Sequence, residues 1–377
     1  MSKKDGGGQP TAAKSSPGAF ALSEILSQPL CWNTCLSELR DSRTLSRIAE
    51  EHGGKRSWLF VGCGSSFYVA LSAASTLTAL TGMPARAVPA SEILLFPQLT
   101  LVGEDCIPVL ISRSGRTSEV LKVAEALRER NIATLGISCA PNQTLEQLVS
   151  SAIVLPAADE QSTVMTRSFT SMLMALQALA ATLARQEDFL ESQRALKPCA
   201  GRLINELPNR VEEFVSRHAF ADYVCLGQGA LYGVACESAL KLTEMSVSYG
   251  QSFHTLEFRH GPKSIVSQQT LIMFLLSESG YKAELEVLEE IKELGGVTFV
   301  VTNRADDRAR RAADFMVELG ADGPELARLP LYLPAQQLLG LYTGIKKGLD
   351  PDRPRHLSRV VVLEDEPSSE ASEHAAI

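Results

Sequence analysis

The chain has 377 residues, of which 45% are apolar and 21% charged, and its formal net charge is −8. This length favours two domains over one core. An acidic chain without a long Lys/Arg run is a poor candidate for nucleic-acid binding, which depends on neutralising phosphates. The sequence contains no long apolar stretch of the kind that a signal peptide or a membrane span requires. Its eight cysteines are scattered, which is typical of buried free thiols in a reducing compartment. We therefore expect a cytoplasmic protein without a membrane partner.

Four segments follow one another along the chain. Residues 1–19 are rich in Gly, Ser, Pro and Ala and are predicted to form a disordered arm. A first domain with a helical lead-in is expected over 20–205 and a second domain over 206–363. Residues 364–377 are acidic and rich in Ser and Ala, which predicts a second loose tail.

An internal repeat of 165 residues determines the predicted architecture. An apolar run ending in Gly-Cys-Gly-Ser-Ser at 62–66 is echoed at 227–231, and Ser-Arg-Ser-Gly at 112–115 is echoed by Ser-Glu-Ser-Gly at 277–280. A helical pattern and a further apolar run follow in both copies. Each copy predicts strand, Gly turn, helix, strand, Ser turn, helix, strand. This order predicts α/β domains, each a parallel sheet flanked by helices in a flavodoxin-like or Rossmann-like three-layer sandwich.

The Ser-rich turn of the first copy is a candidate phosphate site. Ser112, Ser114 and Thr117 lie between a predicted strand and a helix, where free N–H groups and the helix dipole favour an anion. Arg113 adds positive charge. The alternative is that the hydroxyls only cap the helix. In the second copy Glu278 would repel a phosphate, so we expect only the first copy to bind one.

A candidate acid/base segment lies in the second copy. Lys241 and Glu244 are three residues apart and share a face of a predicted helix, and His260 precedes Gly-Pro in a predicted rigid loop. A Glu and a His are suitable for moving a proton between C1 and C2 of a sugar and for opening its ring. A surface ion pair is the structural alternative. His254, Glu257 and His260 do not have the spacing of a zinc site, and we expect no metal or cofactor.

Together these motifs resemble tandem sugar isomerase (SIS) domains. The resemblance runs from about residue 25 to 362 and includes Glu-Ser-Ala-Leu-Lys-Leu-Thr-Glu at 237–244, Glu-Phe-Arg-His-Gly-Pro-Lys at 257–263 and Met-Thr-Arg-Ser-Phe-Thr at 165–170. It is similar to the isomerase half of glucosamine-6-phosphate synthase and to the stand-alone galactosamine-6-phosphate deaminases and tagatose-6-phosphate ketose-aldose isomerases.

The resemblance implies a role for each matching residue. It implies that Glu244 is the proton shuttle, that Lys241 lines the same site, and that His260 assists ring opening across the interface of a homodimer. Hydroxyls would hold the phosphate, and Glu160 and Thr166 would lie near the sugar. The implied phosphate-binding positions are Ser65, Ser66, Ser112, Ser114 and Thr117.

Two departures from this pattern limit the expected chemistry. Arg359 stands where the synthase has a lysine that can form an imine, and a guanidinium does not serve as an amine nucleophile. The amidotransferase domain and its N-terminal cysteine are not in this sequence, so ammonia from glutamine is not expected.

The sequence therefore favours a hexosamine 6-phosphate deaminase/isomerase that releases ammonia from a small sugar phosphate. Three alternatives stay open: a neutral aldose–ketose phosphosugar isomerase, a fructosamine-phosphate deglycase, and a sugar-phosphate sensor without catalysis.

Overall fold

The computed structural model describes residues 16–101 and 105–361. Most of the predicted arm and the whole predicted tail, 364–377, lie outside these ranges. The last residues of the arm belong to the fold, because the Gly18 N–H donates to Asp350 Oδ1 at 3.0 Å and the first helix begins at Ala19.

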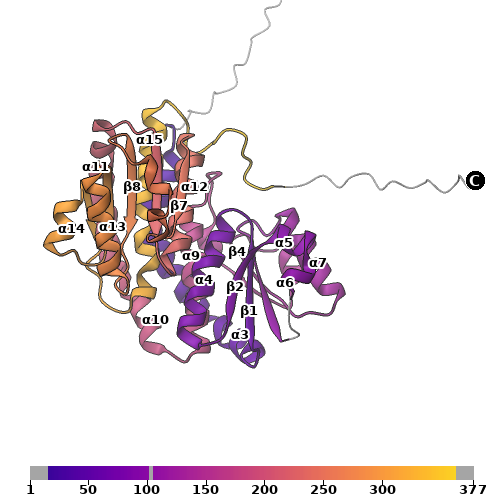
Figure 1. The fold of residues 1–377 in the computed structure, drawn as a ribbon. Helices are drawn as coiled ribbons and strands as arrows, with labels where there is room; N and C mark the ends of the chain where they lie inside the picture. Colours follow the sequence, from indigo (N-terminus) through magenta and orange to yellow (C-terminus); the bar gives the residue numbers. More distant parts are fainter. Residues whose placement is uncertain (1–15, 102–104, 362–377) are drawn as a thin grey trace, which may run out of the picture.

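Two five-stranded parallel sheets form the frame (Figure 1), which confirms the predicted α/β repeat. Their orders, β2-β1-β3-β4-β5 and β7-β6-β8-β9-β10, are the same once each strand is matched to its repeat partner. The strands of the first sheet are β1 (Ser57–Gly62), β2 (Ala85–Pro89), β3 (Cys106–Ile111), β4 (Leu135–Ser138) and β5 (Ser151–Val154). Those of the second are β6 (Asp222–Gly227), β7 (Gly250–Phe253), β8 (Thr270–Leu275), β9 (Val297–Thr302) and β10 (Phe315–Glu318).

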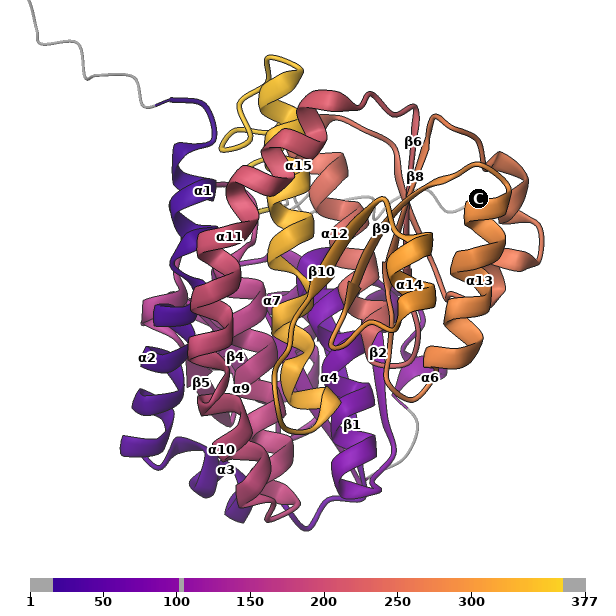
Figure 2. The same cartoon turned by 90° about the vertical axis from the view of Figure 1, so that its left-hand side faces the viewer.

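Long helices fill the space between the two sheets, and shorter ones cover their outer faces (Figures 1 and 2). The central helices, together with those packed against them, are α1 (Ala19–Leu26), α2 (Gln28–Asp41), α4 (Ser65–Thr81), α9 (Arg167–Leu183), α11 (Leu196–Arg217), α12 (Leu231–Ser246) and α15 (Pro334–Lys346). The remaining α-helices are α3 (Thr44–His52), α5 (Ala90–Leu95), α6 (Pro97–Thr100), α7 (Ser118–Glu129), α8 (Thr144–Leu148), α10 (Glu187–Arg194), α13 (Tyr281–Glu293) and α14 (Asp307–Ala312). The 3₁₀ turns are η1 (Pro156–Ala158), η2 (Glu257–Arg259), η3 (Pro262–Ile265) and η4 (Glu325–Tyr332).

Alternation along the strands explains this layering, because successive side chains of a strand point to opposite faces. Phe60 on β1 and Met273 on β8 belong to one central core shared by both halves. Leu59 on β1 and Phe274 on β8 belong instead to separate outer cores. The inner faces of the two sheets therefore contribute to one shared core, and the outer face of each sheet has a core of its own.

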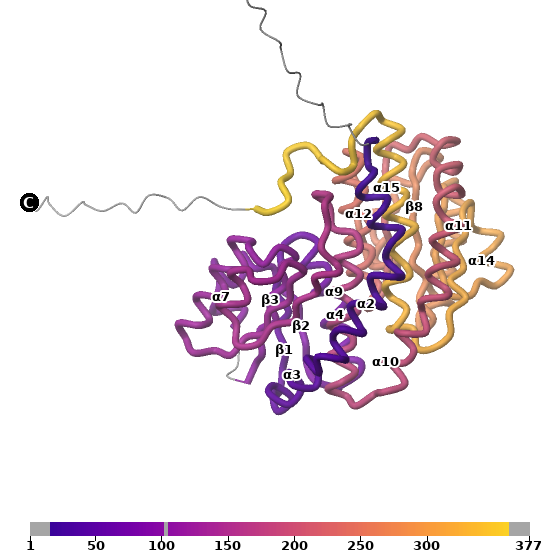
Figure 3. Tube along the Cα trace, turned by 180° about the vertical axis from the view of Figure 1, so that it is seen from behind, coloured from indigo at the N-terminus to yellow at the C-terminus, as the bar shows by residue number. Residues whose placement is uncertain are grey.

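The connection between the halves is a helix. The division predicted between residues 205 and 206 falls inside α11, which runs over 22 residues without a break. The N-terminal helices lie against the second half as well: α1 packs on α15 and α2 packs on α11 (Figure 3). None of the helices in the described ranges is long and apolar enough to cross a membrane.

Candidate functional site

The Ser-rich turn joins the end of β3 to the start of α7. Ser112 is buried, and its Oγ lies 2.9 Å from Thr117 Oγ1, the residue that precedes α7. Gly115 has φ of 64°, and a Cβ at this position would lie 2.7 Å from Gln143 Cβ. Only glycine therefore fits this turn, and the hydroxyls gather at the N-terminus of a twelve-residue helix.

The Gly-rich turn after β1 lies beside the Ser-rich turn. Strands β1 and β3 are parallel neighbours, with Val61 opposite Leu110, so both turns leave the sheet at the same edge. Ser65 and Ser66 are buried in the first turn of α4. The structure therefore brings together all five predicted phosphate-binding hydroxyl residues, on two adjacent helix N-termini.

A buried ionic cluster on α12 faces these turns. Lys241 has no exposed surface, and its Nζ lies 3.2 Å from Glu237 Oε1, 3.3 Å from Ser65 Oγ, and within bonding distance of Glu244 Oε2. Ser65 Oγ in turn donates to Glu237 Oε1 at 3.1 Å. One hydroxyl thus connects the candidate phosphate site of the first half to the acid/base segment of the second.

Glu237 is a member of this cluster that the sequence analysis did not single out. Its spacing from Lys241 and Glu244, four and seven residues, places all three on one helix face and could have identified it. Burial raises the pKa of Glu237 to about 8. Burial also lowers the pKa of Lys241, but the carboxylates of Glu237 and Glu244 outweigh it, so that this pKa is raised and the lysine stays a cation.

Three predicted substrate-binding residues form a buried network behind the Ser-rich turn. Glu160 accepts from the Thr166 N–H at 2.6 Å and from Thr166 Oγ1 at 2.8 Å, which caps the start of α9. Arg113 Nη1 donates to the other Glu160 oxygen at 3.3 Å and to the Val164 carbonyl at 3.2 Å. The guanidinium of Arg113 and the carboxylate of Glu160 are thus bonded to protein groups, in an arrangement that supports the turn.

The C-terminal segment crosses the edge of the first half. Arg359 Nη2 lies 2.5 Å from Asp159 Oδ1, and the Arg359 carbonyl accepts from Arg113 Nη2 at 2.8 Å. Farther along, the Val361 carbonyl accepts the N–H of Ser118, the first residue of α7, at 3.3 Å. Arg359 therefore lies at the margin of the site and is partly exposed.

His260 lies on an exposed loop between η2 and η3. The neighbouring Arg259 and Lys263 both bind Glu290 of α13, which fixes the loop against the outer face of the second sheet. Within the described part of the chain, no hydrogen bond or ion pair connects the imidazole to Glu244. One copy of the chain thus presents His260 outward.

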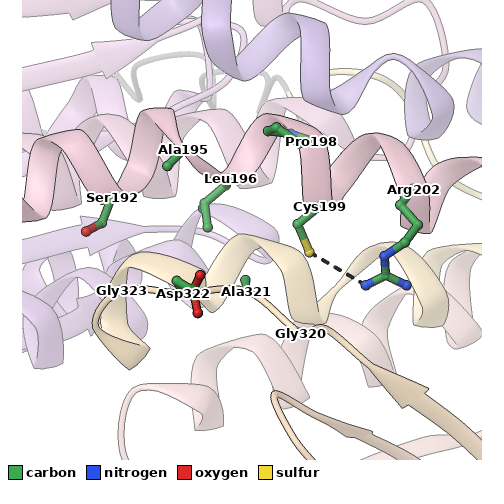
Figure 4. Close-up of a pocket in the computed structure, with 10 residues that line it drawn as sticks. All are labelled: Ser192, Ala195, Leu196, Pro198, Cys199, Arg202, Gly320, Ala321, Asp322 and Gly323. Atoms are coloured by element: carbon green, nitrogen blue, oxygen red, sulfur yellow. Dashed lines mark hydrogen bonds between the residues drawn. The ribbon is translucent and has the colours of Figure 1, made fainter.

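A separate cavity of about 470 Å³ lies where α11 faces the loop 320–323 (Figure 4). Cys199 and Arg202 point from the helix toward this loop, and Cys199 Sγ donates to the Leu319 carbonyl at 2.9 Å. Burial raises the pKa of this thiol, so it is not a candidate nucleophile.

The fold and the candidate site define a tandem α/β protein in which two hydroxyl-rich turns lie beside a buried ionic cluster. The SIS domain family matches residues 54–182 and 223–335, so both halves of the chain are covered. The chain belongs to the SIS domain family, and the enzymes in this family and among its relatives indicate that it is an enzyme.

Several relatives cover nearly all of the chain. The glutamine–fructose-6-phosphate aminotransferase (isomerizing) of Bacteroides thetaiotaomicron is 26% identical over 366 residues, which are 92% of this chain and 58% of that protein. The chain thus spans less than two thirds of such curated relatives.

Solved structures of similar size match the whole fold. Glucosamine-6-phosphate deaminase from Thermotoga maritima has a TM-score of 0.77 and 29% identity, covering 92% of this chain and 100% of the other. Tagatose-6-phosphate ketose/aldose isomerase from Escherichia coli has a TM-score of 0.81 at 22% identity, covering 94% and 100% of the two chains. The second match supports the fold alone.

Proposed function

We propose that this protein is a hexosamine 6-phosphate deaminase/isomerase, which converts an amino-aldose phosphate to a ketose phosphate and releases ammonia. The observation that carries the proposal is the hydrogen-bonded connection through Ser65. These bonds join the hydroxyl-rich turns of the first half to the buried cluster of Glu237, Lys241 and Glu244, which supports one site with a phosphate end and an acid/base end. A sugar whose 6-phosphate lay on the two turns would extend its other end toward Glu244.

The proposed reaction is a proton shift followed by hydrolysis. Glu244 removes the proton from C2 of the open-chain sugar and returns it to C1, while the amine loses a proton and the C1 oxygen gains one. C1 thereby becomes a CH2OH group, and the substrate's own amine becomes a C2 imine. Water adds to this imine, the C–N bond breaks, and ammonia leaves with its proton as the C2 ketone forms. Lys241 holds Glu244 by a direct ion pair, and Glu237 holds Lys241 in turn.

This route needs no amine from the protein. Arg359 is paired with Asp159, and the Lys241 ammonium is enclosed by the side chains of Glu237 and Glu244, so neither is suited to attack a carbonyl. The substitution of arginine at position 359 is thus compatible with deamination, because the imine arises within the substrate.

We further propose that two copies form a homodimer in which His260 of one subunit completes the site of the other. The exposed imidazole and the loop fixed by Glu290 support this arrangement, since a rigid loop can present a ring-opening group to a neighbouring subunit at little entropic cost.

The test is ammonia release from glucosamine 6-phosphate and from galactosamine 6-phosphate, each supplied alone. We expect release from one of them, a loss of at least about 100-fold in Glu244→Gln, and full activity in Glu286→Gln, which changes an exposed glutamate of α13. Conversion of a neutral aldose phosphate to its ketose without ammonia release from either amino sugar would contradict the deaminase and indicate the neutral isomerase.

A further inference from the structure

The second half contains a cavity of about 450 Å³ at the position that corresponds to the catalytic site of the first. A shift of 165 residues converts the lining residues Ser277, Ser279 and Gly280 into Ser112, Ser114 and Gly115. The same shift converts Glu325 into Glu160. The cavity also has the size of ordinary small-molecule sites, about 300–1,000 Å³.

Each half contributes a helix to the site of the other half, and the two helices, α4 and α12, are related by an internal pseudo-twofold axis. The first site receives Glu237, Lys241 and Glu244 from α12, and the second receives the corresponding face of α4. The residues of α4 that correspond to this triad are Ser72, Thr76 and Ala79. Ser72 Oγ donates to the Ala230 carbonyl at 2.8 Å, where the first half has the bond between Ser65 and Glu237. The second cavity therefore has no acid/base group from the neighbouring helix.

Carboxylates occupy the donors that a phosphate would need. Glu284 accepts from the Ser277 N–H at 2.9 Å and from Ser277 Oγ at 2.5 Å, and Glu325 Oε1 accepts from the Glu278 N–H at 2.6 Å. Glu278, which replaces Arg113 of the first copy, pairs with the buried Arg328. These contacts support the prediction that the second copy does not bind phosphate.

Two side chains that line the cavity carry acceptor oxygens, one without a paired cation and the other without a hydrogen-bond partner among the described residues. Glu325 lines the wall, and within the described ranges no cation pairs with its carboxylate. Gln228 also lines it, and its buried Oε1 has no hydrogen-bond partner in the described part of the chain. A negative charge and an unpartnered carbonyl oxygen select a ligand that donates hydrogen bonds and carries a positive charge.

We propose that this second cavity is a non-catalytic binding site for a small polyhydroxylated amine, such as an unphosphorylated amino sugar. Glu325 binds the ammonium group, the side-chain amide of Gln228 forms a hydrogen bond with a hydroxyl, and Ala79 forms part of the apolar wall. The proposal does not depend on turnover at the first site.

The experiment is calorimetric titration of the full chain with D-glucosamine, with D-glucose and inorganic phosphate as comparison ligands. We expect glucosamine to bind at least 10-fold more tightly than glucose. Glu325→Gln should weaken glucosamine binding at least 10-fold, and Ala79→Leu, which fills the cavity from an exposed helix position, should abolish it. Both variants should bind inorganic phosphate as the wild type does.

Thr117→Ala serves as the matched control at the first site. It should weaken phosphate binding and leave glucosamine binding unchanged. Glucosamine binding that survives in Ala79→Leu, that disappears in Thr117→Ala, or that is absent from the wild type would overturn the proposal. Ammonia release, measured in the same variants, tests the first site separately, so failure of one proposal is distinguishable from failure of the other.

Discussion

Gly115 determines the shape of the candidate phosphate turn. Its φ of 64° belongs to the left-handed region, and an added Cβ would contact Gln143 at 2.7 Å. We expect Gly115→Ala to lower the free energy of unfolding by about 2 kcal/mol or more and to weaken phosphate binding. Urea denaturation and phosphate titration measure both effects. Gly54→Ala is the control, because nothing lies within 4 Å of the added Cβ, and equal effects of the two substitutions would refute the assignment.

The protonation of Glu237 gives the folding stability a defined pH dependence. Its pKa in the folded state, about 8, is above the ordinary carboxyl range, so near neutral pH the folded protein binds a proton that the unfolded chain has lost. The contribution of this residue is therefore fully present below about pH 4.5 and decreases as the pH rises toward 8.

Replacing Glu237 with Gln should remove this dependence, since the amide keeps an acceptor for Ser65 and does not titrate. We expect the slope of stability against pH to become less negative by up to about 1.4 kcal/mol per pH unit. Urea midpoints at about pH 5, 6.5 and 8 give the slope. Identical slopes in wild type and variant, with Glu286→Gln as reference, would show that Glu237 is ionised throughout.

At the scale of the element, α1 receives its N-terminal cap from the far end of the chain. The helix has no side-chain cap of its own, and Asp352 accepts from the Phe20 N–H at 3.0 Å and from the Ala21 N–H at 2.7 Å. Asp352→Ala should cost about 1–2 kcal/mol and speed amide exchange in α1. Asp322→Ala, at a 95% exposed position, should do neither. Unchanged exchange in α1 would contradict the capping role.

The sequence predicted those elements of the site whose residues are neighbours along the chain. The Ser-rich turn, the helix after it and the face shared by Lys241 and Glu244 all follow from local spacing. The bond from Ser65 to Glu237 joins residues 172 positions apart, and no local pattern contains it. Arg113 was expected to add charge to the phosphate turn and Glu160 to lie near the sugar. Their burial together behind the turn depends on tertiary packing that spacing alone does not specify.

For the whole molecule, the repeat of 165 residues was sufficient to predict two parallel sheets, because equal spacing of strands and turns constrains the topology. The shared core could not be predicted in this way. It arises because the inner faces of both sheets pack on the same helices, and α11 runs from one half to the other as one continuous helix.

We therefore expect the two halves to unfold in a single cooperative transition. Both tryptophans, Trp32 and Trp58, lie in the first half, so their fluorescence reports on that half, and far-ultraviolet circular dichroism reports on both. Coincident urea curves from the two probes are the expected result. A fluorescence midpoint separated from the dichroism midpoint would show that the halves fold independently.

The internal pseudo-twofold axis also affects how the protein can change in evolution. In a dimer of identical single domains every substitution appears at both symmetry-related sites. A helix that supplies a base to one site therefore supplies the same base to the other site. In this chain α12 and α4 are encoded separately. Ala79 holds in α4 the position that Glu244 holds in α12, and a substitution of Ala79 alters the second cavity only. Selection can therefore act on the second cavity without loss of the chemistry of the first.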